Sequence, residues 1–203
     1  MIKYLVVYFA IFLATLQLVF KRRIMSEIFK VNIDGYEAEL PVLPLPSGIK
    51  IAFFNLHGAT LLTEHCGKSL AKYLNDCEVI ITAESKGLQL AHVTARELGQ
   101  EYYAVARKTQ KLYMQDGIGI NYGSSITTGK PQQLFLSKHD VDLIKGKKVG
   151  IVDDVISTGE SLKGLESLVE LAGGIITKKA FVLAEGNAAD RKDVIYLAKI
   201  PLL

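Results

Sequence analysis

The most chemically suggestive stretch of the sequence is KVGIVDDVISTGES, from Lys148 to Ser161. Its apolar part, Val149–Val152, has β-branched residues and strand length, which predicts a buried parallel strand. Two adjacent acids, Asp153 and Asp154, come where this strand is expected to end. Carboxylates accept hydrogen bonds from sugar hydroxyls and bind Mg²⁺, so the pair could hold a ribose or a metal shell.

The segment after the acids has the composition of a phosphate site. It consists of Ser157, Thr158, Gly159, Glu160 and Ser161, and leucines then recur at three- and four-residue steps that predict a helix. Free backbone N–H groups and the dipole at a helix N-terminus favour an anion, and the hydroxyls add donors. Glycine lets the backbone approach a ligand or adopt a positive φ. For the acids alone, a helix cap in a tight turn is the alternative.

A second unit of strand, polar loop and helix precedes this stretch. Glu78–Ala83 predicts a buried strand, and apolar residues at helical steps predict a helix over Leu88–Leu98. The loop between them, Glu84-Ser85-Lys86-Gly87, places a cation at a helix N-terminus, which fits a pyrophosphate. The carboxyl end of a parallel strand is also where α/β sheets usually bind ligands.

A third polar segment follows the strand predicted over Tyr102–Ala106. It contains three cations, Arg107, Lys108 and Lys111. Such a group at a strand end is compatible with a solvated turn or with a site for an anionic ligand. The residues alone leave both interpretations open.

Taken together, these motifs resemble type I phosphoribosyltransferases. The order of strand, two acids, two apolar residues and small-Thr-Gly-any-Ser/Thr resembles the family's signature for phosphoribosyl pyrophosphate (PRPP). The resemblance covers nearly all of residues 49–199. It implies that Asp153 and Asp154 hold the ribose hydroxyls, with Mg²⁺ bound near them through PRPP. The loop from Ser157 to Ser161 would wrap the 5′-phosphate.

The resemblance also assigns the two cationic segments. Residues 84–87 resemble the Glu-Ser-Arg-Gly loop of adenine enzymes, which binds pyrophosphate and often contains a non-proline cis peptide. Arg107, Lys108 and Lys111 resemble the Arg-Lys-x-x-Lys segment of purine enzymes, whose cations reach the pyrophosphate. The expected catalytic residues are therefore Asp153, Asp154, Lys86 and Arg107. The expected pyrophosphate ligands are Glu84, Ser85, Lys86, Gly87, Arg107, Lys108 and Lys111.

The region from Leu112 to Phe135 has short apolar pieces between turn residues, which predicts a mobile hairpin. The family closes such a loop over the reacting centre, and its expected working residues here are Ser125, Thr127 and Thr128. Adenine enzymes carry a glutamate in this loop as a candidate acid or base. This chain has Thr127 where that glutamate is expected, which leaves the proton-transfer residue open.

Two further residues are expected at the purine base. The resemblance implies base contacts for Asn55 and Val155, although a turn role for Asn55 is an equal alternative. Asn55 and parts of the hairpin look nearer to xanthine-type enzymes. Those enzymes use a lysine after the strand predicted over Ile175–Ala184. This chain has no lysine between Lys179 and Lys192, which counts against xanthine.

Alternating strands and helices after Glu78 predict a parallel α/β sheet. The resemblance implies a Rossmann-like five-strand core flanked by helices, with a small N-terminal hood. We expect a hood and base-binding region at residues 25–60 and a phosphoribosyltransferase core at residues 61–203. Within the hood, Asp34-Gly35 predicts the turn of a strand pair, and Pro41, Pro44 and Pro46 predict a turn-rich link.

Residues 1–24 form a separate hydrophobic extension. Tyr4–Phe20 is almost wholly apolar and is followed by Lys21-Arg22-Arg23. A run of about 17 residues is at the lower limit for crossing a bilayer, and the basic flank would keep the following chain in the cytoplasm. We favour a different interpretation, in which Met25 is the natural start. A membrane is then a partner only if the extension is translated and inserts.

Composition excludes several other classes. The 203 residues carry a net charge of +3, and the part after the extension is near neutral, which does not indicate a nucleic-acid binder. The two cysteines form no disulfide framework, as expected for a reduced, cytoplasmic protein. No cysteine–histidine spacing indicates zinc.

The combined prediction is a purine-salvage glycosyltransferase of the purine branch, with adenine enzymes as the nearest resemblance. It would transfer the 5-phosphoribosyl group from PRPP to adenine, giving AMP and pyrophosphate, with Mg²⁺ as cofactor and as a homodimer. A xanthine or hypoxanthine-guanine enzyme is the first alternative. A regulator that senses PRPP or nucleotides without catalysis is the second, although residues 25–60 show no helix-turn-helix. The Arg107-Lys108 pattern disfavours an orotate enzyme.

Overall fold

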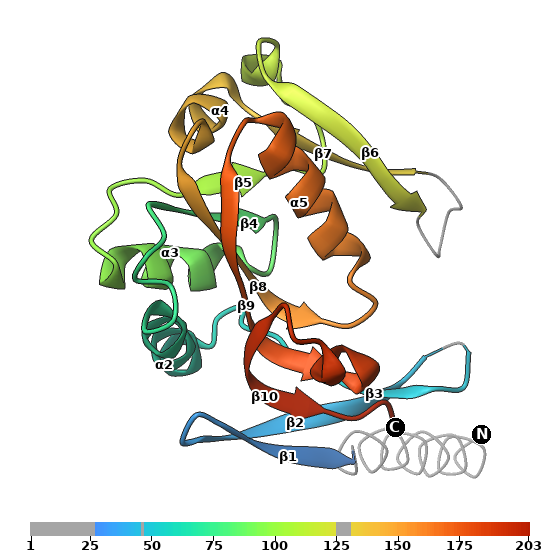
Figure 1. The fold of residues 1–203 in the computed structure, drawn as a ribbon. Coiled ribbons are helices and arrows are strands. Elements are labelled where there is room, and N and C mark those ends of the chain that lie inside the picture. Colours follow the sequence, from blue (N-terminus) through green and yellow to red (C-terminus); the bar gives the residue numbers. More distant parts are fainter. Residues whose placement is uncertain (1–26, 46, 125–130) are drawn as a thin grey trace, which may run out of the picture.

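The computed structural model describes residues 27–45, 47–124 and 131–203 (Figure 1). The expectations for residues 1–24, and for Ser125, Thr127 and Thr128 of the closing loop, fall outside these ranges. Within them, no helix has the length and apolar character that crossing a membrane would need.

A five-stranded sheet forms the centre of the molecule, and all of its neighbouring strands are parallel. The strand order is β10-β9-β8-β4-β5. Their bounds are β4 (Val79–Ala83), β5 (Ala104–Ala106), β8 (Lys148–Ile156), β9 (Ile175–Glu185) and β10 (Ile195–Ile200). The parallel α/β core predicted from alternating strands and helices is therefore confirmed.

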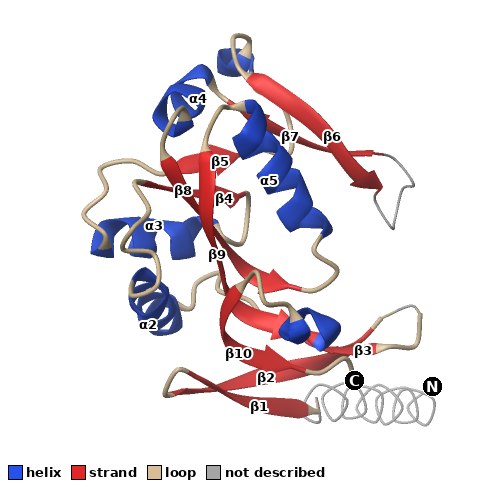
Figure 2. Cartoon of the chain, viewed as in Figure 1, coloured by secondary structure: helices blue, strands red, loops and turns tan. Residues whose placement is uncertain are grey.

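Helices cover both faces of this sheet (Figure 2). On one face, α2 (Thr60–Ala71) and α3 (Leu88–Glu97) bury residues such as Leu70 and Leu90 in a core shared with the hood. On the other face, α5 (Glu160–Leu171) packs with α4 (Lys138–Ile144) and a hairpin of β6 (Ile118–Ser124) and β7 (Pro131–Leu136). Two short 3₁₀ turns, η1 (Leu112–Met114) and η2 (Gly186–Asp190), complete the described elements.

The predicted hood is an antiparallel sheet of β1 (Ile28–Ile33), β2 (Tyr36–Pro44) and β3 (Lys50–Ala52). Asp34 and Gly35 have φ values of 50° and 94°, which the tight hairpin turn requires, so the predicted strand pair is confirmed. The C-terminus also joins the hood, because Leu202 bridges to Ile51. Figure 1 shows the hood beside β10 at one end of the molecule.

The prediction that prolines mark a turn-rich link was wrong at Pro41 and Pro44, which lie inside β2. The strand changes partners at this point: Pro41 pairs with Ile28 at the end of β1, and Val42 already pairs with Ala52 of β3. A proline without an N–H donor is tolerated where a ladder ends. Strand β3, which pairs with the second half of β2, is short and ends at Ala52.

Candidate active site

The two acids lie within strand β8 and not after it. We expected the strand to end at Val152, but it continues to Ile156. Its pairing with β4 stops at Ile151, whereas its pairing with β9 includes Asp153 and Val155. Strand β8 therefore extends beyond β4, with hydrogen bonds on one side only, and presents the acids at the carboxyl edge of the sheet. This edge is where parallel α/β sheets bind ligands.

Burial and mutual repulsion perturb the acid pair. Asp154 is 6% exposed, and its backbone N–H donates to Oδ1 of Asp153 at 2.9 Å. Removal from water, followed by the charge of Asp154, raises the pKa of Asp153 to about 7. A neighbouring cation or a set of hydroxyl donors would offset this repulsion. The pair is therefore arranged for a ligand that supplies positive charge or hydrogen-bond donors.

The predicted phosphate loop joins β8 to α5. Gly159 caps the helix with φ 80°, so the positive φ expected from the sequence is confirmed. Glu160 begins α5, and its N–H contacts the hydroxyl of Thr158 at 3.4 Å. A small cavity of about 120 Å³ lies against the loop and is lined by Asp153 and Val155 as well as Ser157, Thr158, Gly159 and Ser161. Asp153 and the phosphate loop thus border one space.

The predicted pyrophosphate loop joins β4 to α3 and touches the acid pair. The peptide bond between Glu84 and Ser85 is cis, as the resemblance implied. Lys86 Nζ lies 3.6 Å from Oδ2 of Asp154. A Cβ at Gly87 would overlap the buried hydroxyl of Thr82 and lie 2.8 Å from Asp153 Oδ1. Only glycine lets this loop pack so closely against the carboxylate.

Glu84 connects the pyrophosphate loop to the cationic segment after β5. Its carboxylate pairs with Nε of Arg107 at 2.7 Å and accepts from the N–H of Lys108 at 2.6 Å. The backbone of Arg107 also exchanges hydrogen bonds with Phe135 of β7, at 2.9 and 2.8 Å. Glu84 therefore orients the cationic segment. An ionised carboxylate accepts hydrogen bonds and donates none, so an anionic ligand would contact Arg107 and Lys108 and not Glu84 itself.

The three cations of that segment occupy different places. Arg107 pairs with Glu84, and the positive charge of Lys108 acts on Asp153, which places Lys108 on the acid pair's side. Lys111 stands at the start of η1 and forms no ion pair within the described part of the chain. The structure thus brings Arg107 and Lys108 to the site and leaves Lys111 at its margin.

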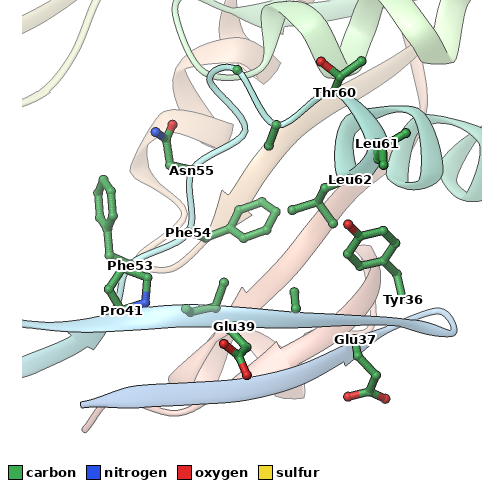
Figure 3. A pocket seen from close by; sticks show the side chains of 14 residues that line it. Tyr36, Glu37, Glu39, Pro41, Phe53, Phe54, Asn55, Thr60, Leu61 and Leu62 are labelled. Atoms are coloured by element: carbon green, nitrogen blue, oxygen red, sulfur yellow. The ribbon is translucent and has the colours of Figure 1, made fainter. Parts of the chain in front are cut away.

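Asn55, which was expected at the purine base, lies on the same side of its segment as the aromatic ring of Phe53 (Figure 3). Lys86 Nζ lies 5.3 Å from the centre of the Phe53 ring. Asn55 accepts from the N–H of His57 at 3.2 Å, which is the turn contact considered above. Figure 3 shows Phe53 and Asn55 on one side of the segment and Phe54 on the other, where it faces Leu62. This segment and β2 line a pocket of about 690 Å³.

Two contacts at the site were not predicted from the sequence. The ring of Tyr122 in β6 packs on Gly164 of α5, and its hydroxyl donates to Gln132 Oε1 at 2.9 Å. Arg191, after η2, places its guanidinium against Gly159. Both contacts join segments far apart in the chain, and no local pattern indicates either.

The donor set suits Mg²⁺ that arrives with a phosphorylated substrate. Oδ2 of the buried Asp154 has no hydrogen-bond partner among the described residues, although Lys86 lies nearby. Elsewhere in the same part of the chain, no group of three or more acids, histidines and cysteines could hold a metal. Mg²⁺ is commonly held by one or two carboxylates together with substrate phosphates and water. Asp153 and Asp154 fit that role.

The sequence of this chain also matches a known protein family. Residues 56–199 match the family described as phosphoribosyl transferase domain. The chain belongs to the phosphoribosyltransferase family. The family predicted from the motif around Asp153 and Asp154 is thereby confirmed, as is its fold.

The similar proteins are named for different purines. The xanthine phosphoribosyltransferase of an Exiguobacterium species is 32% identical over 148 residues, which cover 69% of this chain and 75% of that protein. That of Bacillus thuringiensis is 34% identical over 138 residues, covering 64% and 68%. The structure of adenine phosphoribosyltransferase from Thermoanaerobacter pseudethanolicus matches with a TM-score of 0.65 and 25% identity, covering 79% of this chain and 95% of that one.

Proposed function

We propose that this chain is a purine phosphoribosyltransferase that converts PRPP and adenine to AMP and pyrophosphate. The observation that carries the proposal is the convergence of three elements on one sheet edge. The acid pair of β8 is next to both ligand loops: Asp153 lines a cavity together with the loop that precedes α5, Gly87 packs against Asp153, and Lys86 lies 3.6 Å from Asp154. These elements match the ribose, the 5′-phosphate and the pyrophosphate of PRPP in turn.

In the proposed reaction, the bond between C1′ of PRPP and the pyrophosphate oxygen breaks, and pyrophosphate leaves with the electron pair. N9 of the purine forms the new bond to C1′, and the N9 proton leaves the base. Positive charge grows on the ribose as the first bond breaks, and the carboxylates of Asp153 and Asp154 favour it. Each acid also accepts a hydrogen bond from a ribose hydroxyl, which fixes the sugar.

The leaving pyrophosphate requires positive charge on its own side. Lys86 and Lys108 supply it, with Arg107 held in place by Glu84 and Lys111 from the following turn. Mg²⁺ bound with PRPP near the acid pair would add charge neutralisation of the leaving group. The free N–H groups around Gly159 bind the 5′-phosphate, which does not react and serves to position C1′.

Adenine is our first choice of base, because β9 ends in a carboxylate, Glu185, and no lysine lies between Lys179 and Lys192. The amino group of adenine is a hydrogen-bond donor, which an acceptor such as Glu185 suits. Xanthine is the second candidate. It is favoured by the two xanthine phosphoribosyltransferases described above, which are 32% and 34% identical and are covered over 75% and 68% of their own lengths.

The test measures pyrophosphate release by the full-length protein with Mg²⁺ and PRPP, using adenine, hypoxanthine, guanine, xanthine and orotate in parallel. Adenine is expected to give the highest kcat/KM. A higher kcat/KM with xanthine than with adenine would contradict the proposed adenine activity and support the second candidate function. Tight PRPP binding without turnover of any base would instead indicate a nucleotide-sensing regulator.

We also propose that the enzyme acts in the cytoplasm as a homodimer. Cys66 and Cys77 are buried and free, as expected in a reducing compartment. Leu112 and Tyr113 are 89% and 70% exposed beside the cationic segment, which is apolar surface that a second copy could cover. Light scattering of the purified protein tests the dimer: a monomer mass at micromolar concentration would contradict it.

A further inference from the structure

A full positive charge lies directly against the proposed 5′-phosphate loop. A Cβ built on Gly159 would come 2.8 Å from Nη1 of Arg191 and 4.0 Å from its Cζ. Arg191 follows η2 and precedes β10, so it reaches the loop from a distant part of the chain. The absence of a side chain at Gly159 is what admits the guanidinium, in addition to allowing φ 80°.

The guanidinium is held in one orientation by Asp193. Its Nε donates to Oδ1 at 3.0 Å and its Nη2 to Oδ2 at 2.6 Å. This two-bond pairing uses one edge of the planar group and fixes its plane. The remaining nitrogen, Nη1, is the atom that faces Gly159. The pairing with Asp193 therefore orients Arg191 so that one donor nitrogen, Nη1, points toward the loop.

Asp193 is in turn linked, through Lys179, to helix α5, which follows the phosphate loop. Lys179 Nζ contacts Asp193 at 2.5 Å and Glu166 of α5 at 2.9 Å. Hydrogen bonds from Arg191 and then Lys179 hold the pKa of Asp193 well below its usual range. The network of two cations and two acids links β9, α5 and the segment before β10.

We infer that Arg191 is an additional residue of the 5′-phosphate site, where it stabilises the phosphate dianion of bound PRPP. The inference rests on the proposed function, which places that phosphate at the Ser157–Ser161 loop. The loop itself offers partial charges from N–H and hydroxyl groups, and its one charged residue is the acid Glu160. A phosphate with two negative charges needs a stronger partner, and guanidinium is well suited to phosphate oxygens.

The test uses the full-length protein and two ligands that occupy different ends of the site. Calorimetry with ribose 5-phosphate and with pyrophosphate is performed on the parent protein, Arg191→Gln and Arg191→Lys. Arg96→Gln is the matched control, because Arg96 also forms a two-bond pair with a carboxylate, Glu64, on the surface of α3. The thermal midpoint of each variant is measured to establish that it folds.

Arg191→Gln is expected to weaken ribose 5-phosphate about tenfold, which corresponds to about 1.4 kcal/mol, and to leave pyrophosphate within about twofold. The KM for PRPP should rise by a similar factor. Arg191→Lys should fall between, because lysine keeps the charge but cannot pair with Asp193 and face the loop at once. Arg96→Gln should match the parent protein.

Unchanged ribose 5-phosphate affinity in Arg191→Gln would overturn the inference, as would equal weakening of both ligands. These results are separable from the proposed function. Purine turnover by the parent protein with no effect of Arg191 removes the inference alone. Loss of ribose 5-phosphate binding in the variant, without turnover of any base by the parent, supports the inference and removes the proposed reaction.

Discussion

Lys86 Nζ and Asp154 Oδ2 lie 3.6 Å apart, although Lys86 is in the loop between β4 and α3 and Asp154 is in β8. Asp154 is 9% exposed in its side chain and Lys86 is 43% exposed, so the lysine keeps one side toward solvent. The same ammonium lies over Phe53 at 5.3 Å. Lys86 thus stands between the acid pair, the base side and the open side of the site, where a leaving pyrophosphate would emerge.

Replacement of Lys86 by alanine should lower kcat/KM for PRPP by about 10²–10³-fold, because a charge aimed at the leaving group is lost. Lys86→Arg should recover part of that activity. Lys68→Ala removes a surface lysine that pairs with Glu64 on α2 and should have no effect. Steady-state rates of pyrophosphate release provide the measurement. Activity of Lys86→Ala within about threefold of the parent would contradict the assigned role.

Asp153 should make the ligand-free protein less stable at alkaline pH. Burial, followed by the charge of Asp154, raises its pKa to about 7. The folded state therefore binds a proton that the unfolded state releases near pH 4. This contribution to stability is full below about pH 4, falls as the pH rises from about 4 to 7, and is lost above about 7.

Asp153→Asn should remove that loss. At pH 8 the variant should be more stable than the parent by about 1–2 kcal/mol, a rise in Tm of a few degrees, and the difference should shrink at pH 5. Scanning calorimetry across this range is the measurement. Asp116→Asn, in an exposed turn, is the control. A parent protein whose Tm exceeds that of Asp153→Asn at pH 8 would be inconsistent with the perturbed carboxyl.

Glu84 should act through Arg107 and Lys108. Because its carboxylate contacts both at 2.7 and 2.6 Å, Glu84→Gln keeps an acceptor but loses the charge pair. We expect kcat/KM for PRPP to fall about tenfold, and Glu84→Ala to lose more and to be destabilised by about 1–3 kcal/mol. Glu64→Gln, at the surface pair with Arg96, should leave turnover unchanged. Full activity of Glu84→Ala would show that the cationic segment needs no such support.

Gly164 should be required for the packing of the β6–β7 hairpin on α5. A Cβ there would lie 2.8–3.1 Å from ring atoms of Tyr122. Alanine favours a helix, but the overlap should outweigh that gain and destabilise the protein by about 1–3 kcal/mol. Denaturation by urea measures the change, and Ser167→Ala, exposed on the same helix, should be nearly neutral. If Tyr122→Ala added to Gly164→Ala restored no stability, the overlap would not be the cause.

Local patterns in the sequence were enough to predict the parallel sheet, the hood hairpin and the two ligand loops. Each depends on residues close together in the chain, such as Asp34-Gly35 with positive φ or the segment from Asp153 to Ser161. The cap of α4 is equally local, since Ser137 and Asp140, three residues apart, form a capping box. Features of this kind leave a signature within a few residues.

Features that depend on distant partners were not predicted. The length of β8 is set by its pairing with β9, so the acids remain in the strand after the apolar run ends at Val152. The contact between Arg191 and Gly159 and the pairing of Glu84 with Arg107 likewise require tertiary structure. Sequence alone showed that these residues are charged or small, but not which partners they meet.

The most direct test of the central claim is a product analysis with the full-length protein, PRPP, Mg²⁺ and adenine. Nucleotide is identified by mass, and pyrophosphate is quantified in the same reaction. We predict AMP and pyrophosphate in equal amounts, with formation of both reduced at least about a hundredfold when Asp153 and Asp154 are both replaced by asparagine. Equal activity of the parent and the double variant, or pyrophosphate release without any nucleotide, would contradict the account.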